Sequence, residues 1–388
     1  MPTALRLSLF YAAFFLSNGV LVPFWPVWLA SRGLSPAELG VLFAIGQWVG
    51  IAATPVIGTV ADHSGNPRRV MLILAAVAMA GFLLCFPAQG FAALVALNAL
   101  LAASLGTLIP VGDSLAISAT QQGRADYGRV RMWGTITFIV ATLLGGRILS
   151  GRAPDVVLDL VVPLTALNVG GCLLLPRGAT HFASGITRSS AWRLMRTQRY
   201  VVFLAAMTLI SASHIVYYAF GSLRWQAQGF SNTTIGWLWA EGAAAEAVFL
   251  FWGARAVARY GPARLMALGA ASGAVRWIVL GLTGDLRLLV LAQLLHAGTV
   301  GAVMLGSMHY LGRSIPPAQA ATGQAITNAV VAAIGASVFM PLVGALYGAY
   351  GGLTYLMMAA LSAAGMVVAL MLERLLAAAP SNLNASPS

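Results

Sequence analysis

The chain has 388 residues, of which 59% are hydrophobic and only 8% are charged. Soluble domains carry about 25% charged residues, so a chain this apolar cannot cover a water-facing surface and indicates a polytopic membrane protein. All 22 basic residues are Arg, and they are scattered between apolar runs, which argues against a nucleic-acid-binding protein despite the net charge of +12. Both cysteines lie inside apolar runs, so neither a disulfide framework nor a metal site is expected.

The apolar residues form runs long enough to cross a bilayer, which needs about 20 residues of helix. The run after Arg6 is too long for the core of a signal peptide, so we expect a retained first helix. Short connections rich in Gly, Pro, Ser or Arg separate the runs. Twelve transmembrane helices are predicted, at residues 5–30, 36–60, 69–87, 91–118, 128–149, 157–176, 199–223, 232–252, 263–282, 286–310, 319–346 and 351–376.

One connection, residues 177–198, is longer than the others and carries several Arg residues. It divides the chain into two sets of six spans. We therefore predict an all-α membrane protein with two pseudo-symmetric six-helix bundles, residues 1–176 and 199–376, joined by a cytoplasmic linker. The polar residues 377–388 predict a disordered tail.

The two predicted bundles share short sequence matches. Residues 33–40, GLSPAELG, match residues 229–236, GFSNTTIG, at an offset of 196. The same offset maps Gly65-x-x-Arg68 onto Gly261-x-x-Arg264. Both matches fall at corresponding loops, which indicates a duplicated unit. Transporters commonly use such repeats and bind their solute near the midplane between them.

The Arg residues also predict the orientation of the chain. With a cytoplasmic N-terminus, 16 Arg residues lie inside, 5 lie outside, and Arg276 lies within a span. Cytoplasmic loops carry an excess of positive charge, so both termini are expected in the cytoplasm.

The loop after the second span, GTVADHSGNPRR, resembles the signature loop of the major facilitator superfamily. Glycines allow two helices to meet at a tight turn, and the Asp can cap a helix or pair with an Arg. We expect this loop to act as a conformational latch, with an ordinary charged loop as the alternative. The latch residues are Gly58, Asp62, Gly65, Arg68 and Arg69.

Three further stretches resemble the phenylpropionate-permease branch of that superfamily, which borders the nucleoside:proton symporters. They are PFWPVWL at 23–29, YGRVRMWG at 127–134, and the run from Leu295-His296 to His309-Tyr310. The resemblance implies the major facilitator fold, a monomer in the bacterial inner membrane, and proton-coupled uptake of a small organic solute such as an aromatic acid. The proton gradient would replace any cofactor.

Few polar groups lie inside the spans, and a charge at mid-bilayer costs about 2.5–3.5 kcal/mol on insertion scales, so each such group is a candidate for function. Glu246 is the predicted protonation site. Glu241 precedes it by five residues and points about 140° away, so it is expected to bind the substrate or a structural partner. Arg276 cannot lose its proton, so it must be paired or hydrated. It is expected to hold Glu246 ionised or to bind a substrate carboxylate. The alternative is that its side chain extends to the outer membrane interface.

The set of Glu246, Arg276 and His296 resembles the carboxylate–arginine–histidine arrangement of the proton-coupled lactose permeases. This resemblance implies a proton-coupling role for His296, although a lone His in a helix is more often a packing residue. In the first half, Asp113 follows Pro110 and Gly112, which loosen the helix, and it is predicted to couple protons or bind substrate. Asn18, Gln47 and Tyr217 are predicted to contact the substrate, with interhelical contacts as the alternative.

The predicted function is therefore symport of a small organic solute with a proton by alternating access. Proton-driven efflux of drugs or metabolites is one alternative, and a non-transporting receptor or assembly factor is another. An enzyme is not expected, because the sequence has no nucleotide-binding loop and no recognisable nucleophile motif. The expected partners are the small-molecule substrate and membrane lipids, not nucleic acid.

Overall fold

The structure, a computed structural model, describes residues 1–176, 188–315 and 317–378. Within these ranges all regular secondary structure is helical, which confirms the predicted all-α membrane fold. Residues 379–388 of the predicted tail and residues 177–187 of the predicted linker lie outside the described residues. The rest of the linker contains the helix α7 (Arg188–Met195), and Ala377, the first residue of the predicted tail, still belongs to a helix.

The first half contains six long helices, one for each predicted span. They are α1 (Thr3–Ser31), α2 (Pro36–His63), α3 (Pro67–Cys85), α4 (Phe91–Gln121), α5 (Tyr127–Leu149) and α6 (Val156–Leu174).

In the second half, three of the spans are interrupted. These three are α8 (Gln198–Ala212) with α9 (Ile215–Ala227), α12 (Leu286–Leu294) with the π-helical turn η1 (Ala297–Ala302) and α13 (Val303–Ser314), and α14 (Pro317–Ile334) with the π-helical turn η2 (Gly335–Phe339) and α15 (Met340–Tyr350). The others are α10 (Asn232–Tyr260), α11 (Pro262–Leu282) and α16 (Thr354–Ala377), which follows the short turn η3 (Gly351–Leu353).

Ten segments of the described chain are long and apolar enough to cross a membrane. One of them, Gly323–Ala377, has 55 residues and reverses direction at Gly351, where the backbone φ is +54°, so it supplies two crossings. The helix α10 is not among the ten, because its acidic and Arg residues reduce its hydropathy. Counted in this way, the segments give the twelve crossings that the sequence predicts.

The loops at the two repeat positions fold alike. Gly33 and Gly229 both have φ of +86°, a conformation that favours glycine. Ser35 and Ser231 then cap the next helices by accepting hydrogen bonds from the backbone N–H of Glu38 and Thr234. The sequence match at an offset of 196 therefore reflects the same turn and the same helix start in both halves.

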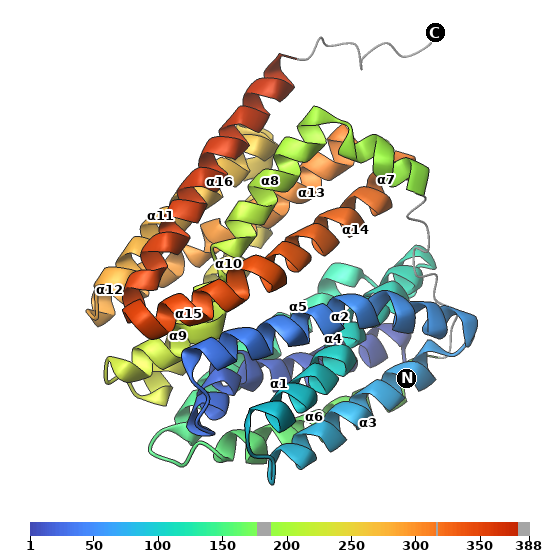
Figure 1. Ribbon diagram of the computed structural model, residues 1–388. Coiled ribbons are helices and arrows are strands. Elements are labelled where there is room, and N and C mark those ends of the chain that lie inside the picture. The colour runs from blue at the N-terminus through green and yellow to red at the C-terminus, as the bar shows by residue number, and fades with distance from the viewer. Residues whose placement is uncertain (177–187, 316, 379–388) are drawn as a thin grey trace.

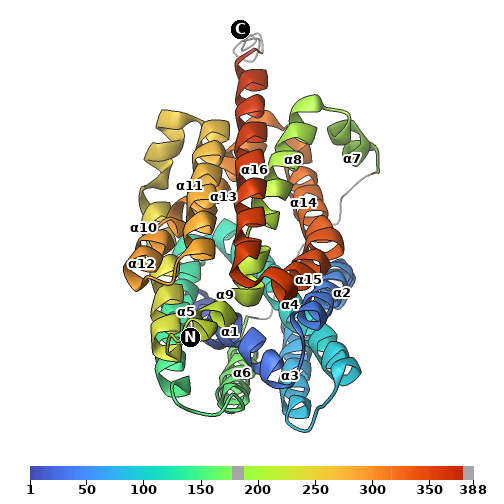
Figure 2. The same ribbon diagram turned by 60° about the vertical axis from the view of Figure 1, so that its left-hand side comes forward.

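The two halves meet at one end and separate at the other (Figure 1). We call the face with both ends of the described chain the terminal face, and the opposite face the distal face. At the distal face, α2 packs against α15 and α5 packs against α10 (Figure 2). Towards the terminal face the helices of the two halves diverge (Figure 1).

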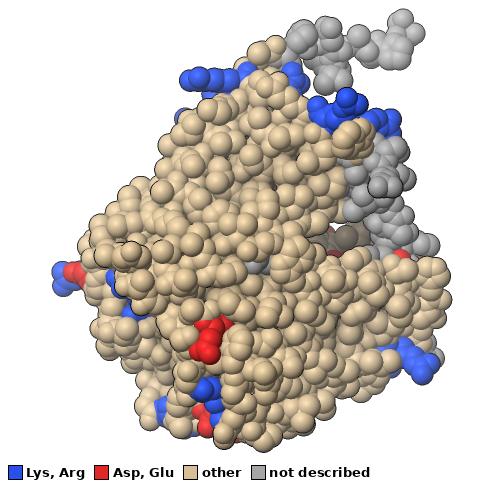
Figure 3. Space-filling model, viewed as in Figure 1, with Lys and Arg blue, Asp and Glu red and all other residues tan. Residues whose placement is uncertain are grey.

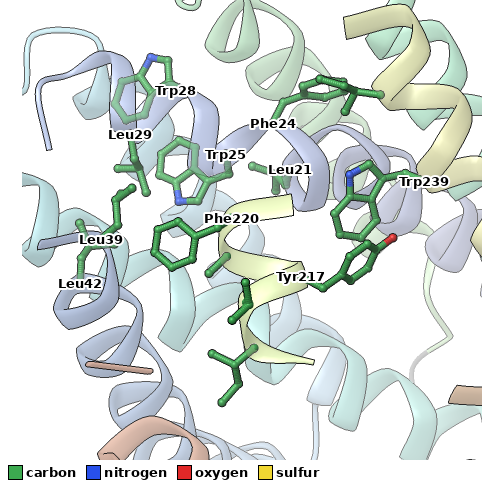
Figure 4. Close-up of a cluster of buried hydrophobic side chains, with 14 of the residues drawn as sticks. Leu21, Phe24, Trp25, Trp28, Leu29, Leu39, Leu42, Tyr217, Phe220 and Trp239 are labelled. Carbon is green, nitrogen blue, oxygen red and sulfur yellow. The ribbon is translucent and has the colours of Figure 1, made fainter. Parts of the chain in front are cut away.

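The buried apolar side chains follow the same pattern. One cluster is shared by both halves at the distal end, where Trp25 and Leu39 of the first half lie near Phe220 and Trp239 of the second (Figure 4). Near the terminal face each half has its own cluster, around Phe10 in the first half and around Tyr200 in the second. The molecule is therefore closed at the distal face and open at the terminal face.

Two pairs of glycines allow the two halves to approach closely at the distal face, along the contacts of α2 with α15 and of α5 with α10, which we call the distal seam. A Cβ atom on Gly40 of α2 would lie 2.8 Å from the carbonyl oxygen of Met340 and 2.9 Å from Cα of Gly344 on α15. A Cβ atom on Gly236 of α10 would lie 2.5 Å from the carbonyl oxygen of Thr142 and 3.2 Å from Cα of Gly146 on α5. Gly40 and Gly236 occupy equivalent repeat positions, so the two helix contacts between the halves use the same kind of glycine packing.

Candidate functional site

The second half contains a buried polar chain around Arg276, whose side chain is fully buried in α11. Its NH1 group donates to Nδ1 of His296 over 2.8 Å and to the hydroxyl of Thr299 over 3.2 Å. Its NH2 group donates to Oε1 of Gln293 over 2.5 Å. At the other side of the imidazole, Nε2 of His296 lies 3.5 Å from Oε2 of Glu246 on α10. The structure thus brings together Glu246, His296 and Arg276, the three residues singled out by their types and spans.

The contact with Arg276 determines which ring nitrogen of His296 carries the proton. A guanidinium has only donors, so Nδ1 of His296 must be the acceptor and carry no proton. A neutral imidazole then carries its proton on Nε2, the nitrogen that faces Glu246. His296 therefore presents a donor to the carboxylate, and the Arg276 contact opposes a second proton on the ring.

Irregular backbone surrounds this chain. The π-helical turn η1 begins directly after His296, and π-turns occur frequently at functional sites. The seventh span is broken between α8 and α9 at Ser213 and His214. The Ser213 hydroxyl accepts from Nε1 of Trp277, and His214 uses Nδ1 to donate to the Ile210 carbonyl. Both interruptions therefore lie close to the charged residues, after His296 itself and at Ser213, which bonds to the neighbour of Arg276.

Aromatic rings cover the guanidinium. The Cζ atom of Arg276 lies 4.4 Å from the centroid of Tyr217 and 4.7 Å from that of Trp277. Cation–π contacts of this kind strengthen when they are desolvated. The Tyr217 hydroxyl also accepts from Gln293 over 3.3 Å, so Tyr217 supports the polar chain from α9. The Nε–H of Arg276 has no hydrogen-bond partner among the described residues, which leaves a donor unused.

A second polar group lies in the first half around Asp113. Its Oδ1 accepts hydrogen bonds from the hydroxyls of Tyr11, at 2.5 Å, and Tyr127, at 3.1 Å. Next to them, the Arg131 guanidinium lies 4.2 Å from the ring centroid of Phe15 and 5.4 Å from that of Tyr11. No carboxylate of the described chain lies within salt-bridge distance of Arg131.

Glu246 connects the two groups electrostatically. The positive charges that act on its carboxylate are those of Arg131, in α5 of the first half, and Arg276, in α11 of its own half. Helices α5 and α10, which carry Arg131 and Glu246, pack against each other. One arginine from each half therefore acts on the carboxylate.

The other predicted site residues lie apart from this group. Glu241 lies on α10, makes no hydrogen bond or ion pair among the described residues, and acts on Tyr217 only through its charge. Asn18 donates to the Phe14 carbonyl of its own helix over 3.0 Å. Gln47 lines a cavity described below. Their binding roles remain predictions.

A cavity of about 940 Å³ occupies the cleft beside the charged residues. It lies between α1, α2 and α4 of the first half and α9, α14 and α15 of the second, and the space-filling view shows a recess between the halves (Figure 3). Its walls carry no charged side chain. Tyr218 connects it to the charged region, because this residue lines the cavity and its ring lies 5.3 Å from that of Tyr217.

The predicted latch lies at the terminal face. Asp62 is in the last turn of α2, Gly65 has φ of +61° in the turn, and Asn66 caps α3 by accepting from the N–H of Arg69. At the repeat position, Gly261 has φ of +75°, and Arg264 pairs with Glu373 of α16 over 3.0 Å. The two loops thus share a glycine turn, and the latch role of the first remains a prediction.

Comparison with known proteins identifies the family. The profile of the MFS_1 like family matches residues 4–359. The chain belongs to this family. It is similar to the probable 3-phenylpropionic acid transporter of Escherichia coli K12, with 30% identity over 313 residues that cover 79% of this chain and 81% of the relative. The resemblance seen in the sequence motifs is thereby confirmed, and the protein is a major facilitator transporter.

Other relatives of this MFS transporter are named for different solutes. The maltose permease of Geobacillus stearothermophilus is 28% identical over 340 residues, which cover 87% of this chain and 85% of the permease. The crystal structure of nucleoside transporter NupG superimposes with a TM-score of 0.82 over 96% of this chain and 100% of that one, at 17% identity. The last match supports the fold. The relatives are transporters and not enzymes, but their names do not select one solute for this chain.

The sequence alone does not predict Arg131 as a site residue. It lies only four positions after the start of α5, where the excess of Arg predicts a cytoplasmic residue. The available signal was its presence in the stretch YGRVRMWG, which carries the family resemblance. Tyr11 and Thr299 gave no comparable signal, since their contacts with Asp113 and Arg276 join distant parts of the chain.

Proposed function

We propose that this MFS transporter imports a small organic anion with an apolar body, such as an aryl carboxylate, together with a proton. The observation that carries the proposal is that Glu246 lies 3.5 Å from His296, which accepts from Arg276, and that the charge of Arg131, from the opposite half, also acts on Glu246. A carboxylate that can be neutralised, and on which two fixed positive charges act, can exchange places with an external anion. The similarity to a probable 3-phenylpropionic acid transporter supports an aromatic acid as the solute.

The proposed cycle follows from charge balance in the cleft. While Glu246 is ionised, its negative charge compensates the positive charges of the two arginines. When Glu246 takes up a proton, this compensation is lost, and the arginines can bind the carboxylate of the solute. The loaded cleft then has the same net charge as the empty one, so the halves can rock without moving an uncompensated charge through the membrane.

In this cycle His296 orients the side chains of Arg276 and Glu246. Its Nδ1 accepts from Arg276 and its Nε2 faces Glu246, so it holds the two charges at a fixed separation. Asp113 accepts hydrogen bonds from Tyr11 and Tyr127, and the Tyr11 ring also contacts the Arg131 guanidinium, so Tyr11 joins Asp113 to Arg131 within the first half. In the proposed cycle Glu246 takes up the proton and the arginines bind the anion.

We also propose that the protein lies in the bacterial inner membrane with both termini in the cytoplasm. The excess of Arg on the terminal face supports this orientation. In that orientation the structure is an inward-open state, because the cleft opens at the terminal face.

The test measures external pH in a lightly buffered suspension of energy-depleted cells that overproduce the protein. Addition of 3-phenylpropionate is expected to cause external alkalinisation beyond that of cells without the protein, whereas maltose and a nucleoside cause none. Glu246→Gln abolishes the difference. Glu38→Gln is the matched control, because Glu38 lies in the capping box of α2 at the distal face and Gln also satisfies that motif.

Two outcomes contradict the proposal. Alkalinisation with maltose or the nucleoside, and not with the carboxylate, excludes the anion class. A full signal in Glu246→Gln removes this residue from proton coupling.

A further inference from the structure

The cavity beside the charged residues is built mainly from apolar and aromatic side chains. Trp25, Phe43, Phe82 and Tyr218 contribute rings, and small or aliphatic residues of α2, α4 and α14 fill most of the remaining wall. Tyr218 is 41% exposed, so its ring is open to the cleft. Such a surface favours an apolar body, and the few polar groups in it set the orientation and specificity of a ligand.

Two of the polar groups in the wall already have protein partners. Asn98 accepts from Nε1 of Trp25 over 3.1 Å and donates to the Leu42 carbonyl over 3.3 Å. The Thr54 hydroxyl donates to the Gly50 carbonyl over 2.9 Å. Asn98 thus joins α4 to α1 and α2, and Thr54 bonds to its own helix, so both groups offer little to a solute.

The side-chain amides of Gln47 and Asn328 differ from these. Gln47, on α2, makes no hydrogen bond among the described residues. Asn328, on α14, accepts one bond from Gln324 over 3.0 Å, and its NH₂ group has no partner in the same part of the chain. Both are exposed to the cleft. The cavity thus has two available amides, one from each half.

The same two amides also line a second recess of about 230 Å³, which continues the cavity towards Ser211 and Gly335. Ser211 precedes the break between α8 and α9, and Gly335 begins η2. Gln47 and Asn328 therefore lie at the junction of the two spaces, between α2 and α14. A group bound there would touch both halves.

Tyr218 connects the region of Arg276 to the cavity that the two amides line. Its ring contacts Tyr217, whose ring covers Arg276. Tyr218 also lines the apolar cavity that reaches the two amides. The cleft therefore offers a charged region, an apolar region and a neutral hydrogen-bonding region in that order.

We propose that Gln47 and Asn328 form a subsite for a neutral polar substituent, a hydroxyl or carbonyl, at the end of the solute opposite its carboxylate. This inference rests on the proposed function and makes the substrate class narrower: an aryl or cyclic carboxylate that carries such a substituent. A plain aryl carboxylate fills the apolar region but leaves both amides without partners.

The preference arises when the cleft closes around the solute. In the open state, water can satisfy the two amides. Closure removes that water, and a polar group left without a partner destabilises the closed state. A hydroxyl on the solute replaces the lost hydrogen bonds, so we expect about tenfold or greater selectivity for the hydroxylated compound.

The experiment compares KM for proton-coupled uptake of 3-phenylpropionate and 3-(4-hydroxyphenyl)propionate. The wild-type protein is expected to show a KM for the hydroxylated acid that is lower by about tenfold or more. In Gln47→Leu and in Asn328→Leu the ratio falls towards one, because leucine removes the amide and keeps a similar size. Gln122→Leu is the matched control: this amide donates to the Ser118 hydroxyl at the end of α4 and does not line the cavity, so the ratio is retained.

The outcomes separate this inference from the proposed function. Equal KM values for both acids in the wild-type protein, with a signal that depends on Glu246, overturn the subsite and leave the proposed function intact. A wild-type preference that persists in both leucine variants also overturns the subsite. Absence of proton uptake with either acid overturns the proposed function and the subsite together. The wild-type ratio tests the inference even where a leucine variant fails to fold.

Discussion

Arg276 donates a hydrogen bond to Nδ1 of His296 over 2.8 Å, and this contact fixes the proton of the neutral imidazole on Nε2. The amide oxygen of Asn can take the place of Nδ1, so His296→Asn keeps an acceptor for Arg276. His296→Leu removes the acceptor and leaves a buried charge less well paired. We expect uptake in His296→Asn to stay within about threefold of wild type and uptake in His296→Leu to fall about tenfold or more, since hydrogen bonds to charged groups contribute about 1.5–3 kcal/mol.

Initial rates of proton-coupled uptake at equal protein amounts in the membrane check this prediction. Equal loss in both variants would show that the Nε2 side of His296 is required, and His296 would then be a proton relay as well as a positioning residue.

Arg131 acts on Glu246 from the opposite half and has no salt-bridge partner among the described residues. If it binds the solute carboxylate, Arg131→Gln raises KM about tenfold or more, because a charge-assisted hydrogen bond is lost. Arg131→Lys keeps the charge without the planar donor pair and is expected to have an intermediate KM. Binding of the uncharged amide of the same solute serves as the control, and an equal loss of affinity for acid and amide would contradict anion binding by Arg131.

The sequence predicts the helices well because the bilayer imposes their length and composition. The first span is expected at 5–30 and observed at Thr3–Ser31, and the capped starts at Ser35 and Ser231 follow from the repeat. The interruptions are harder to predict. Ser213 and His214 contain no Pro or Gly, so nothing local marks the break between α8 and α9.

The candidate site was predictable only in part. Glu246, Arg276 and His296 were identifiable because charge inside a span is costly and therefore informative. Their partners were not, since Thr299 and Gln293 are common polar residues whose roles depend on how spans nine and ten pack. The sequence predicts that the eighth span ends at residue 252, but α10 continues to Tyr260. Arg255 and Arg259 end the apolar run, but they do not end the helix, which continues beyond the bilayer.

The glycine pairs at the distal seam predict how to open the transporter outward. Large side chains at Gly40 and Gly236 cannot fit, because even a Cβ atom would lie 2.8 Å or less from a backbone oxygen of the other half. The double variant Gly40→Trp with Gly236→Trp is therefore expected to separate the halves at the distal face. A reporter cysteine in place of Ala102, which lines the cavity, should then react several times faster with a membrane-impermeant maleimide in intact cells.

Two features make this measurement specific. The native Cys85 and Cys172 are buried, so the background reaction is small. Gly170→Trp is the control, because a Cβ atom there meets no heavy atom within 4 Å. Unchanged reactivity in the double variant would show that these glycines do not hold the distal face closed. Rapid reaction in the parent protein would place the open face outside the cell.

Arg224 joins α9 to the end of α11 by hydrogen bonds, and its position predicts that a substitution at Gly352 lowers the stability of the protein. Its Nε donates to the Leu280 carbonyl over 3.0 Å and its NH2 group donates to the Gly281 carbonyl over 2.7 Å, at the C-terminal end of α11. A Cβ atom on Gly352 would overlap the guanidinium. Gly352→Ala is thus expected to displace Arg224, leave both carbonyls without this donor, and lower the apparent Tm in detergent by a few degrees, as a loss of about 1–3 kcal/mol implies.

A double-mutant cycle separates this mechanism from a general effect of alanine. In an Arg224→Ala background, Gly352→Ala should cause little further loss, because the side chain that it displaces is already absent. Gly348→Ala is the matched control, since its Cβ atom would meet only the Pro36 ring at 3.7 Å, an ordinary contact distance. Additive losses in the double variant would show that Gly352 acts independently of Arg224, through the backbone of η3.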